Sequence, residues 1–142
     1  MLAHCMILPA VLIASIRVQD LAGRWSGRME GRGLSAQLDL DLAREDGGWV
    51  AQLAFRSGPD SSSLVVDELR VALDFVRLRT TIEGADVSID LTLDDRLLVG
   101  SMRAMEDGVL LAESSVGLAQ EGDAEAASQL SRWIAAQGAA ND

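Results

Sequence analysis

The chain has 142 residues, which is long enough for one domain whose hydrophobic core needs no disulfide or metal to support it. It carries 12 basic residues, all of them Arg, against 22 acidic ones, and its formal net charge is −10. Binding to nucleic acid requires clustered cations that neutralise phosphates. The charge therefore argues against a nucleic-acid partner, and equally against an anionic membrane surface.

Chemically reactive side chains are scarce in this sequence. His4 is the single histidine, Cys5 is the single cysteine, and the chain has neither Tyr nor Lys. One thiol can form no intramolecular disulfide, and imidazole and thiolate are the usual ligands of zinc, copper and haem. Acid–base catalysis by His and Schiff-base chemistry by Lys lack their residues. The sequence predicts a protein that is not an enzyme, with no catalytic residue, no metal and no cofactor.

Residues 1–19 make up an apolar N-terminal segment. The run 5–16 is nearly all apolar; it is too short for a membrane-spanning helix but matches the apolar core of a secretory signal. As a signal peptide it predicts a periplasmic or secreted protein without membrane insertion. Because no basic residue precedes the run and no small-x-small cleavage site precedes Gln19, two alternatives stay open. They are a wrongly assigned start codon and an apolar arm packed on the domain.

Between residues 20 and 120, apolar and polar side chains alternate with period two, which is typical of half-buried β-strands. In chain order the expected strands cover residues 24–30, 34–42, 49–55, 64–66, 69–73, 76–83, 86–94, 98–104 and 110–118. In residues 69–75 the side chains expected to face inward are odd-numbered, and from Val76 to Ile82 they are even-numbered, so the inward set changes parity between Phe75 and Val76. A bulge or a tight turn at that point is the simplest cause.

The links between the expected strands are short and rich in turn residues. Residues 45–48, 84–85, 94–95 and 107–108 contain the Gly and Asp that hairpin turns prefer, and residues 57–62 predict an exposed loop. The spacing predicts an all-β fold, an antiparallel up-and-down β-barrel of eight to nine strands over residues 20–120.

The tail, residues 121–142, follows helical spacing instead. Asp123 is a suitable N-cap, Gly138 is a stop signal, and apolar residues between them lie on one face. A C-terminal α-helix packed against the barrel wall is the first interpretation. The alternative is a helix that docks a protein partner, with Trp133 as its anchor.

Carboxylates recur on the same faces of the expected strands. Asp39 and Asp41 form one such group, and residues 86, 90 and 94 form another, and oxygen ligands of this kind suit hard cations such as calcium. Both groups alternate with the apolar set, however. The expected position is therefore a solvated outer face.

The start of the first expected strand has the pattern Leu-x-Gly-x-Trp-x-Gly. With the strand rhythm that follows it, this stretch resembles the lipocalin-like (calycin) barrels, especially small bacterial domains. Gly23 and Trp25 match the Gly-x-Trp motif of that family, whose indole plugs the closed end of the barrel. The family commonly lays an Arg or Lys from the last strand across the ring. Residues 116–120 contain no basic residue, so Gln120 or Arg132 would take that place.

The resemblance implies non-enzymatic binding of a small hydrophobic, lipid-like ligand in the barrel interior. Inward Gly and Ala residues support it, because small side chains leave volume in a barrel. The candidate lining residues are Met29, Trp49, Phe55, Phe75 and Met102, with Ser114 to orient a polar head group. The alternatives are that Ser114 is a satisfied core hydroxyl, and that side chains fill the barrel, which serves as a protein-interaction or accessory module.

Overall fold

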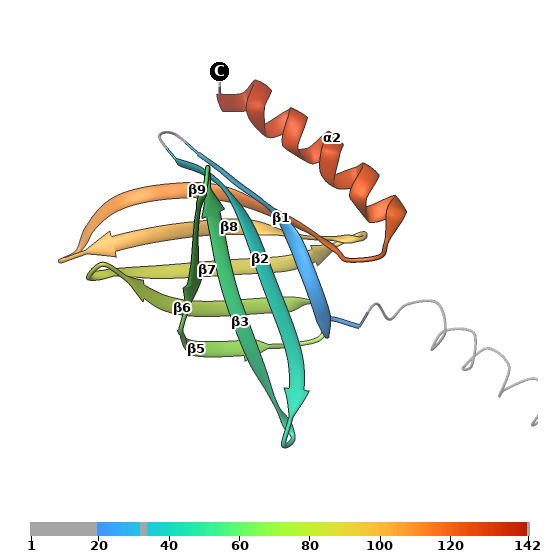
Figure 1. Ribbon diagram of the computed structural model, residues 1–142, viewed down its shortest axis with the longest axis horizontal. Coiled ribbons are helices and arrows are strands. Elements are labelled where there is room, and N and C mark those ends of the chain that lie inside the picture. Colours follow the sequence, from blue (N-terminus) through green and yellow to red (C-terminus); the bar gives the residue numbers. More distant parts are fainter. Residues whose placement is uncertain (1–19, 32–33, 142) are drawn as a thin grey trace, which may run out of the picture.

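The computed structural model describes residues 20–31 and 34–141, which form a nearly closed antiparallel β-barrel with one helix on its outer surface (Figure 1). This confirms the fold class expected from the sequence. Residues 1–19, interpreted above as a signal peptide, lie outside the described part. Within the described part, no helix has the length and hydropathy needed to cross a membrane.

Nine strands form one sheet in which all neighbours are antiparallel. The elements are β1 (Gly23–Gly31), β2 (Leu34–Glu45), β3 (Gly48–Ser57), β4 (Asp60–Leu64), β5 (Val66–Val71), β6 (Phe75–Ile82), β7 (Ala85–Asp94), β8 (Leu97–Glu106), β9 (Val109–Gln120) and the helix α2 (Ala124–Asn141). The order across the sheet is β4-β3-β2-β1-β9-β8-β7-β6-β5. The first and last strands of the barrel therefore pair with each other in the middle of the sheet.

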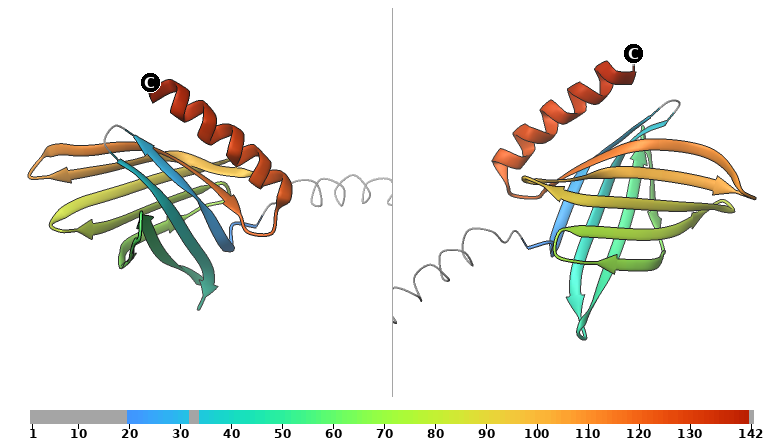
Figure 2. Two further views of the ribbon diagram at one scale, coloured as in Figure 1. Left: turned by 45° about the horizontal axis from the view of Figure 1, so that its top comes forward. Right: turned by 180° about the vertical axis from the view of Figure 1, so that it is seen from behind.

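Tight turns join most neighbouring strands, as the Gly and Asp positions predicted. At the β2–β3 turn, Asp46 and Gly47 both have positive φ, 49° and 77°, and Asp107 and Gly108 of the β8–β9 turn have 52° and 78°. Two successive residues with positive φ give a turn whose twist matches that of the strands it joins. These turns let the sheet coil until β2 and β3 cross β6, β7 and β8 at a steep angle (Figures 1 and 2).

The two ends of the sheet meet at a seam made by one bent stretch of chain. β4 pairs with the second half of β3, and β5, which follows after Val65, pairs with β6. Residues 48–52 of β3 therefore lack a strand partner on this side within the described chain, although β3 and β5 lie next to each other. The hydroxyl of Thr80 on β6 donates to the carbonyl of Val65 and fixes the bend.

The inward side chains of the remaining strands form a tightly packed core. Its buried members include Trp25, Met29, Leu38, Leu40, Leu42, Leu53, Val76, Leu78, Ile89, Leu91, Leu98, Met102, Val116 and Leu118. All of them belong to one cluster and are almost completely excluded from water. Side chains thus fill the part of the lumen that β1, β2 and β6 to β9 enclose.

The helix α2 packs on the outer wall formed by β9, β1 and β8, as the first interpretation predicted (Figure 2). Leu130 and Trp133 cover a small second cluster that contains Leu97 and Ala119. Gly117 is essential for this approach, because a Cβ there would lie 2.6 Å from the Trp133 ring. Asp123 caps the helix by accepting a hydrogen bond from the Ala126 N–H at 3.0 Å.

The structure differs from the sequence-based expectations at β4, and at Phe75 it decides between the two causes considered, a bulge and a tight turn. Part of the stretch expected to be a loop forms β4. Residues Asp60 to Ser63 of this strand are exposed. A strand without a buried face shows no alternation of apolar and polar residues, so the sequence pattern does not reveal it. The parity change at Phe75 is produced by a tight turn in which the Ala72 N–H donates to the Phe75 carbonyl. The register shifts in the sheet occur elsewhere, between Val66 and Glu68 and next to Leu111.

Candidate functional site

Trp25 lies near the start of β1 and belongs to the core of the barrel. Its side chain is fully buried, and its indole N–H donates to the carbonyl of Leu21 at 2.9 Å. Gln120, its partner in the β1–β9 ladder, donates to the carbonyls of Asp20 and Ala22, both at 3.0 Å. Gln120 therefore holds the chain that enters β1 next to Trp25, while Arg132 is exposed on α2.

Trp49 is half-buried at the start of β3. The guanidinium carbon of Arg44, its ladder partner on β2, lies 4.8 Å from the centre of the Trp49 ring. Arg44 also forms an ion pair with Asp20 at 3.1 Å. A cation over an indole face is attracted by the ring electrons, so Arg44 orients Trp49 and links it to the entering chain.

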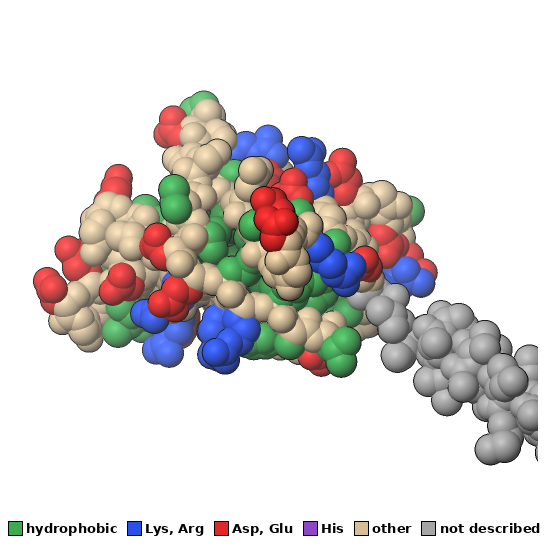
Figure 3. Space-filling view, turned by 90° about the horizontal axis from the view of Figure 1, so that it is seen from below, with side chains coloured by type: hydrophobic (Ala, Val, Ile, Leu, Met, Phe, Trp, Pro, Cys, Tyr) green, Lys and Arg blue, Asp and Glu red, His purple; other side chains and the backbone are tan. Residues whose placement is uncertain are grey.

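Apolar side chains that are only half-buried concentrate on the three strands around the seam. Those that pack against the core from β3, β4 and β5 are Trp49, Ala51, Phe55, Leu64, Val66, Leu69 and Val71. Leu53 is the fully buried hydrophobic residue among these strands. On the face seen from below, where β5 and the β2–β3 hairpin lie, hydrophobic side chains gather near the centre (Figure 3). The seam is thus a place where the apolar interior reaches solvent.

The six residues predicted to line one ligand site do not come together. Trp49 and Phe55 lie on β3 at the seam, half-buried. Met29, Met102 and Ser114 are buried on β1, β8 and β9, where Met102 is the ladder partner of Ser114.

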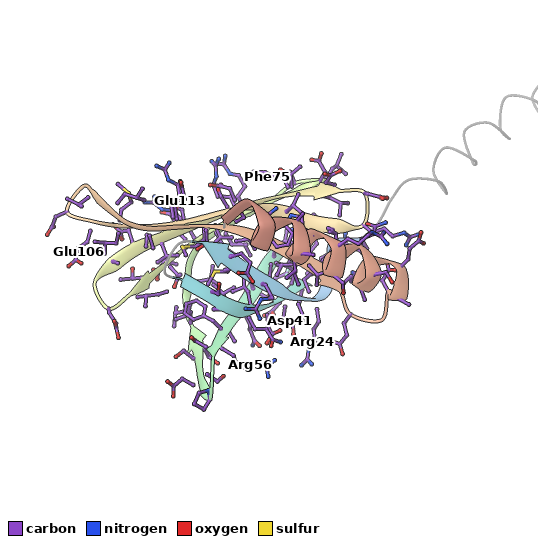
Figure 4. All side chains as sticks on the ribbon, turned by 90° about the horizontal axis from the view of Figure 1, so that it is seen from above. Arg24, Asp41, Arg56, Phe75, Glu106 and Glu113 are labelled. Carbon is purple, nitrogen blue, oxygen red and sulfur yellow. The ribbon has the colours of Figure 1, made fainter. Side chains whose placement is uncertain are left out.

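Phe75 lies outside the lumen, on the outer wall. Its neighbour Val76 points into the core, and the guanidinium carbon of Arg77 lies 5.2 Å from the centre of the Phe75 ring (Figure 4). The expectation that Phe75 faces inward failed because the turn before it resets the parity of β6.

Of the five carboxylates singled out in the sequence, Asp39, Asp41 and Asp90 form ion pairs with Arg on the outer wall, and Asp86 and Asp94 are exposed. Asp41 pairs with Arg24 at 3.6 Å and Asp39 with Arg56 at 3.1 Å, and these groups border a hollow of about 680 Å³ over β1 to β4 (Figure 4). No group of three or more His, Cys, Asp or Glu side chains in the described ranges is placed to hold a metal ion. Asp39 and Asp41 are thus each balanced by a guanidinium, and Glu121 adds a further carboxylate to the lining of this hollow.

A second hollow, of about 670 Å³, lies where β1 ends beside β9. It is lined by Glu30, Gly31, Ser101 and residues 110–115, so it borders Ser114 but neither Trp49 nor Phe55. The second hollow is therefore separate from the seam, whereas the first one borders it at Leu53 and Leu64.

Sequence reasoning missed the contribution of β5 to the seam. Val66, Leu69 and Val71 supply half of its apolar wall, but their strand is short and a register shift follows Val66. The signal that was available is the cluster of Val and Leu in residues 64–71. This cluster indicates a strand, but it does not indicate on which side that strand lies at an end of the sheet.

The fold is a nearly closed antiparallel β-barrel, which is consistent with a calycin-like fold. Comparison of the chain with models of protein families, with curated proteins and with solved structures finds no match.

Proposed function

We propose that this protein is a lipocalin-like binding protein that holds a small, neutral, hydrophobic ligand at the seam between β3 and β5. The observation that carries the proposal is the concentration of half-buried apolar side chains on the strands around the seam. Apolar surface that stays in contact with water gains free energy when a ligand covers it, at about 25 cal/mol per Å².

The shape of the interior limits where such a ligand binds. Trp25, Leu38, Leu98 and their neighbours fill the deep lumen, so the ligand lies against Trp49, Ala51 and Phe55 on one side and Val66, Leu69 and Val71 on the other. Residues 48–52 lack a strand partner on this side within the described residues, so β3 and β5 can separate there without breaking a ladder. The contact is apolar, which suits a lipid-like molecule better than a charged one.

The bend at Val65 keeps the seam in place. Thr80 is buried and its hydroxyl donates to the Val65 carbonyl, so β4 and β5 remain joined to the sheet on both sides of the opening. A periplasmic or secreted location, which rests on residues 1–19, is part of the same proposal: it would place the protein where lipid-like molecules need a carrier through water.

Titration of the full-length protein with N-phenyl-1-naphthylamine, a neutral apolar dye, tests the proposal. We expect saturable binding with a blue-shifted dye emission, and a loss of at least about tenfold in affinity for Leu69→Gln, which puts an amide on the seam wall. Val109→Gln, the same kind of substitution at an exposed position on the β8–β9 hairpin, is the control and should bind like the parent. Far-ultraviolet circular dichroism checks that both variants fold.

Two results would overturn the proposal. One is equal affinity of the parent, Leu69→Gln and Val109→Gln, because the dye would then bind elsewhere. The other is the absence of saturable binding together with native mass spectra that show only the bare chain after incubation with neutral lipids.

A further inference from the structure

The first hollow described above, here called the outer hollow, lies over β1 to β4 next to the place where the seam opens. The ladder between β3 and β4 ends at the pair of Leu53 and Leu64, which line this hollow and also belong to the apolar cluster of the core. Gln52, the first residue of β3 beyond that pair, lines the hollow as well. Successive side chains of a strand point to opposite faces, so Gln52 lies on the outer face while Ala51 packs against the core. The outer hollow and the apolar seam therefore meet at one gap in the wall.

Short side chains form the floor of the outer hollow. One row of ladder partners crosses the four strands there and consists of Ser26, Asp39, Ala54 and Ser63. Longer side chains stand in the adjacent rows, with Arg24 and Gln52 on one side and Arg56 on the other. The hollow has a volume of about 680 Å³, which is within the usual range for sites that bind small molecules.

Several polar groups in the outer hollow are available to a ligand. Within the described part of the chain, the side chains of Ser26, Gln52 and Ser63 form no hydrogen bond with another protein group. All three are at least partly exposed, so water solvates them in the free protein. A ligand that carries hydroxyl groups can take the place of this water and keep the hydrogen bonds.

The charges around the outer hollow favour a head group without net charge. Arg24 pairs with Asp41 and Arg56 pairs with Asp39, and Glu121 adds one more carboxylate (Figure 4). The lining thus has two guanidinium groups against three carboxylates, which disfavours an anion. Each ion pair still has N–H groups and oxygen lone pairs that it does not use, so hydroxyl groups can bind to it without breaking it.

We propose that the ligand of the seam is an amphiphile whose uncharged head group, rich in hydroxyls like a sugar or a glycerol ester, lies in the outer hollow. This inference rests on the proposed function, because the seam holds the apolar tail. The ligand crosses the wall beside Gln52, where β3 has no strand partner on this side within the described residues. Its hydroxyls contact Ser26 and Ser63 on the floor and the two ion pairs beside them.

Displacement of N-phenyl-1-naphthylamine from the full-length protein by n-octyl β-D-glucoside, kept below the concentration at which it forms micelles, tests the head group. Ser63→Leu fills the floor and should raise the glucoside concentration at half-displacement by about tenfold while the affinity for the dye stays the same. Ser61→Leu changes an equally exposed class of residue on the same face of β4 but outside the hollow. It is the matched control and should behave like the parent.

A second variant tests the hydrogen bonds without adding bulk. Gln52→Ala removes an amide from the gap and should raise the glucoside concentration at half-displacement by about fivefold. Far-ultraviolet circular dichroism checks that this variant and the two serine variants fold.

Two amphiphiles with the same tail isolate the role of the head group. n-Octyl sulfate carries an anion and should displace the dye only at higher concentrations than the glucoside, because the lining has an excess of negative charge. 1-Octanol has a single hydroxyl in place of the sugar, so it should displace the dye equally well from the parent and from Ser63→Leu.

The outcomes separate this inference from the proposed function. Equal displacement by the glucoside from the parent, Ser63→Leu and Gln52→Ala overturns the inference, although the seam still binds the dye. Displacement by octyl sulfate at the same concentration as by the glucoside also overturns it. If the dye does not bind, or if Leu69→Gln leaves its binding unchanged, both proposals fail, since the tail then has no site at the seam.

Discussion

The wall formed by β1, β8 and β9 and the seam formed by β3, β4 and β5 carry similar alternating sequences but reach different degrees of burial. Met29, Val116 and Leu118 on the wall are buried on the inner face, and α2 buries Gly117 and Ala119 on the outer face. At the seam, Trp49 and Leu69 point toward the same core yet stay half-exposed.

The difference lies in the neighbours and not in the side chains. β1 and β9 have strand partners on both edges over much of their length, whereas β3 loses its second partner over residues 48–52. An alternating pattern decides which face of a strand turns inward. How far that face is buried depends on strands that lie distant in the sequence.

The largest contrast between the two regions should appear in their tryptophans. Trp25→Ala should lower the free energy of unfolding by about 3 to 5 kcal/mol, because it empties a fully buried position. Trp49→Ala should cost about 1 to 2 kcal/mol, since water already reaches that ring. Urea denaturation of both variants measures the difference. Equal losses would show that the side chain of Trp49 is as well packed as that of Trp25.

The helix-covered outer wall can be probed with a pair of glycines. Gly117→Ala should destabilise by about 1 to 3 kcal/mol and shift tryptophan emission to the red, because the new methyl group displaces Trp133. Gly138→Ala, where a Cβ meets nothing within 4 Å, should stabilise by up to about 1 kcal/mol as an ordinary helix substitution. Loss of stability in both variants would contradict this account of the wall.

The seam depends on one hydrogen bond at its bend. Thr80→Val removes the donor to the Val65 carbonyl and should cost about 1 kcal/mol, while Thr80→Ser keeps the hydroxyl and should cost less. Hydrogen exchange of β4 and β5 amides should accelerate in Thr80→Val. Unchanged exchange would mean that the rest of the sheet fixes the bend.

The smallest effect is expected at the exposed cap of α2. The hydrogen bond from the Ala126 N–H, together with the nearby Arg96, lowers the pKa of Asp123 below its ordinary value of 3.8. Because the pKa is lower in the folded state, the carboxylate stabilises the fold at neutral pH, and this contribution disappears as pH falls through the folded pKa. Asp123→Ala should lower Tm by about 3 °C at pH 7. The difference should shrink below pH 3.8 when thermal unfolding is followed by circular dichroism.

Much of the fold follows from local pattern. The turns at Asp46 and Asp107, the strand positions and the capped helix all depend on residues close together in the sequence, and they were predicted. β4 was not predicted as a strand from Asp60 onward, because an exposed edge of serines has no apolar face to reveal it. The turn before Phe75 placed that ring outside, since a single residue of offset exchanges the two faces of a strand.

The candidate sites were less accessible to sequence reasoning. Trp49, Phe55 and Ser114 were singled out correctly as residues on the inner side, but the sequence does not tell which strands form the ends of a sheet. The seam arises because the pairing of β3 with β4 stops at Leu53. Where the pairing of two strands ends depends on both segments, so neither segment alone contains a sequence pattern that reveals it.

The pairing of β1 with β9 also bears on how the protein is made. During synthesis the ribosome releases β1 long before β9, so one edge of β1 stays without its final neighbour until almost the whole barrel has emerged. Contacts between segments so far apart form slowly, because the chain must first lose the entropy of a long loop. The barrel can therefore close only once β9 has left the ribosome, and the net charge of −10 opposes the association of unfinished copies until then.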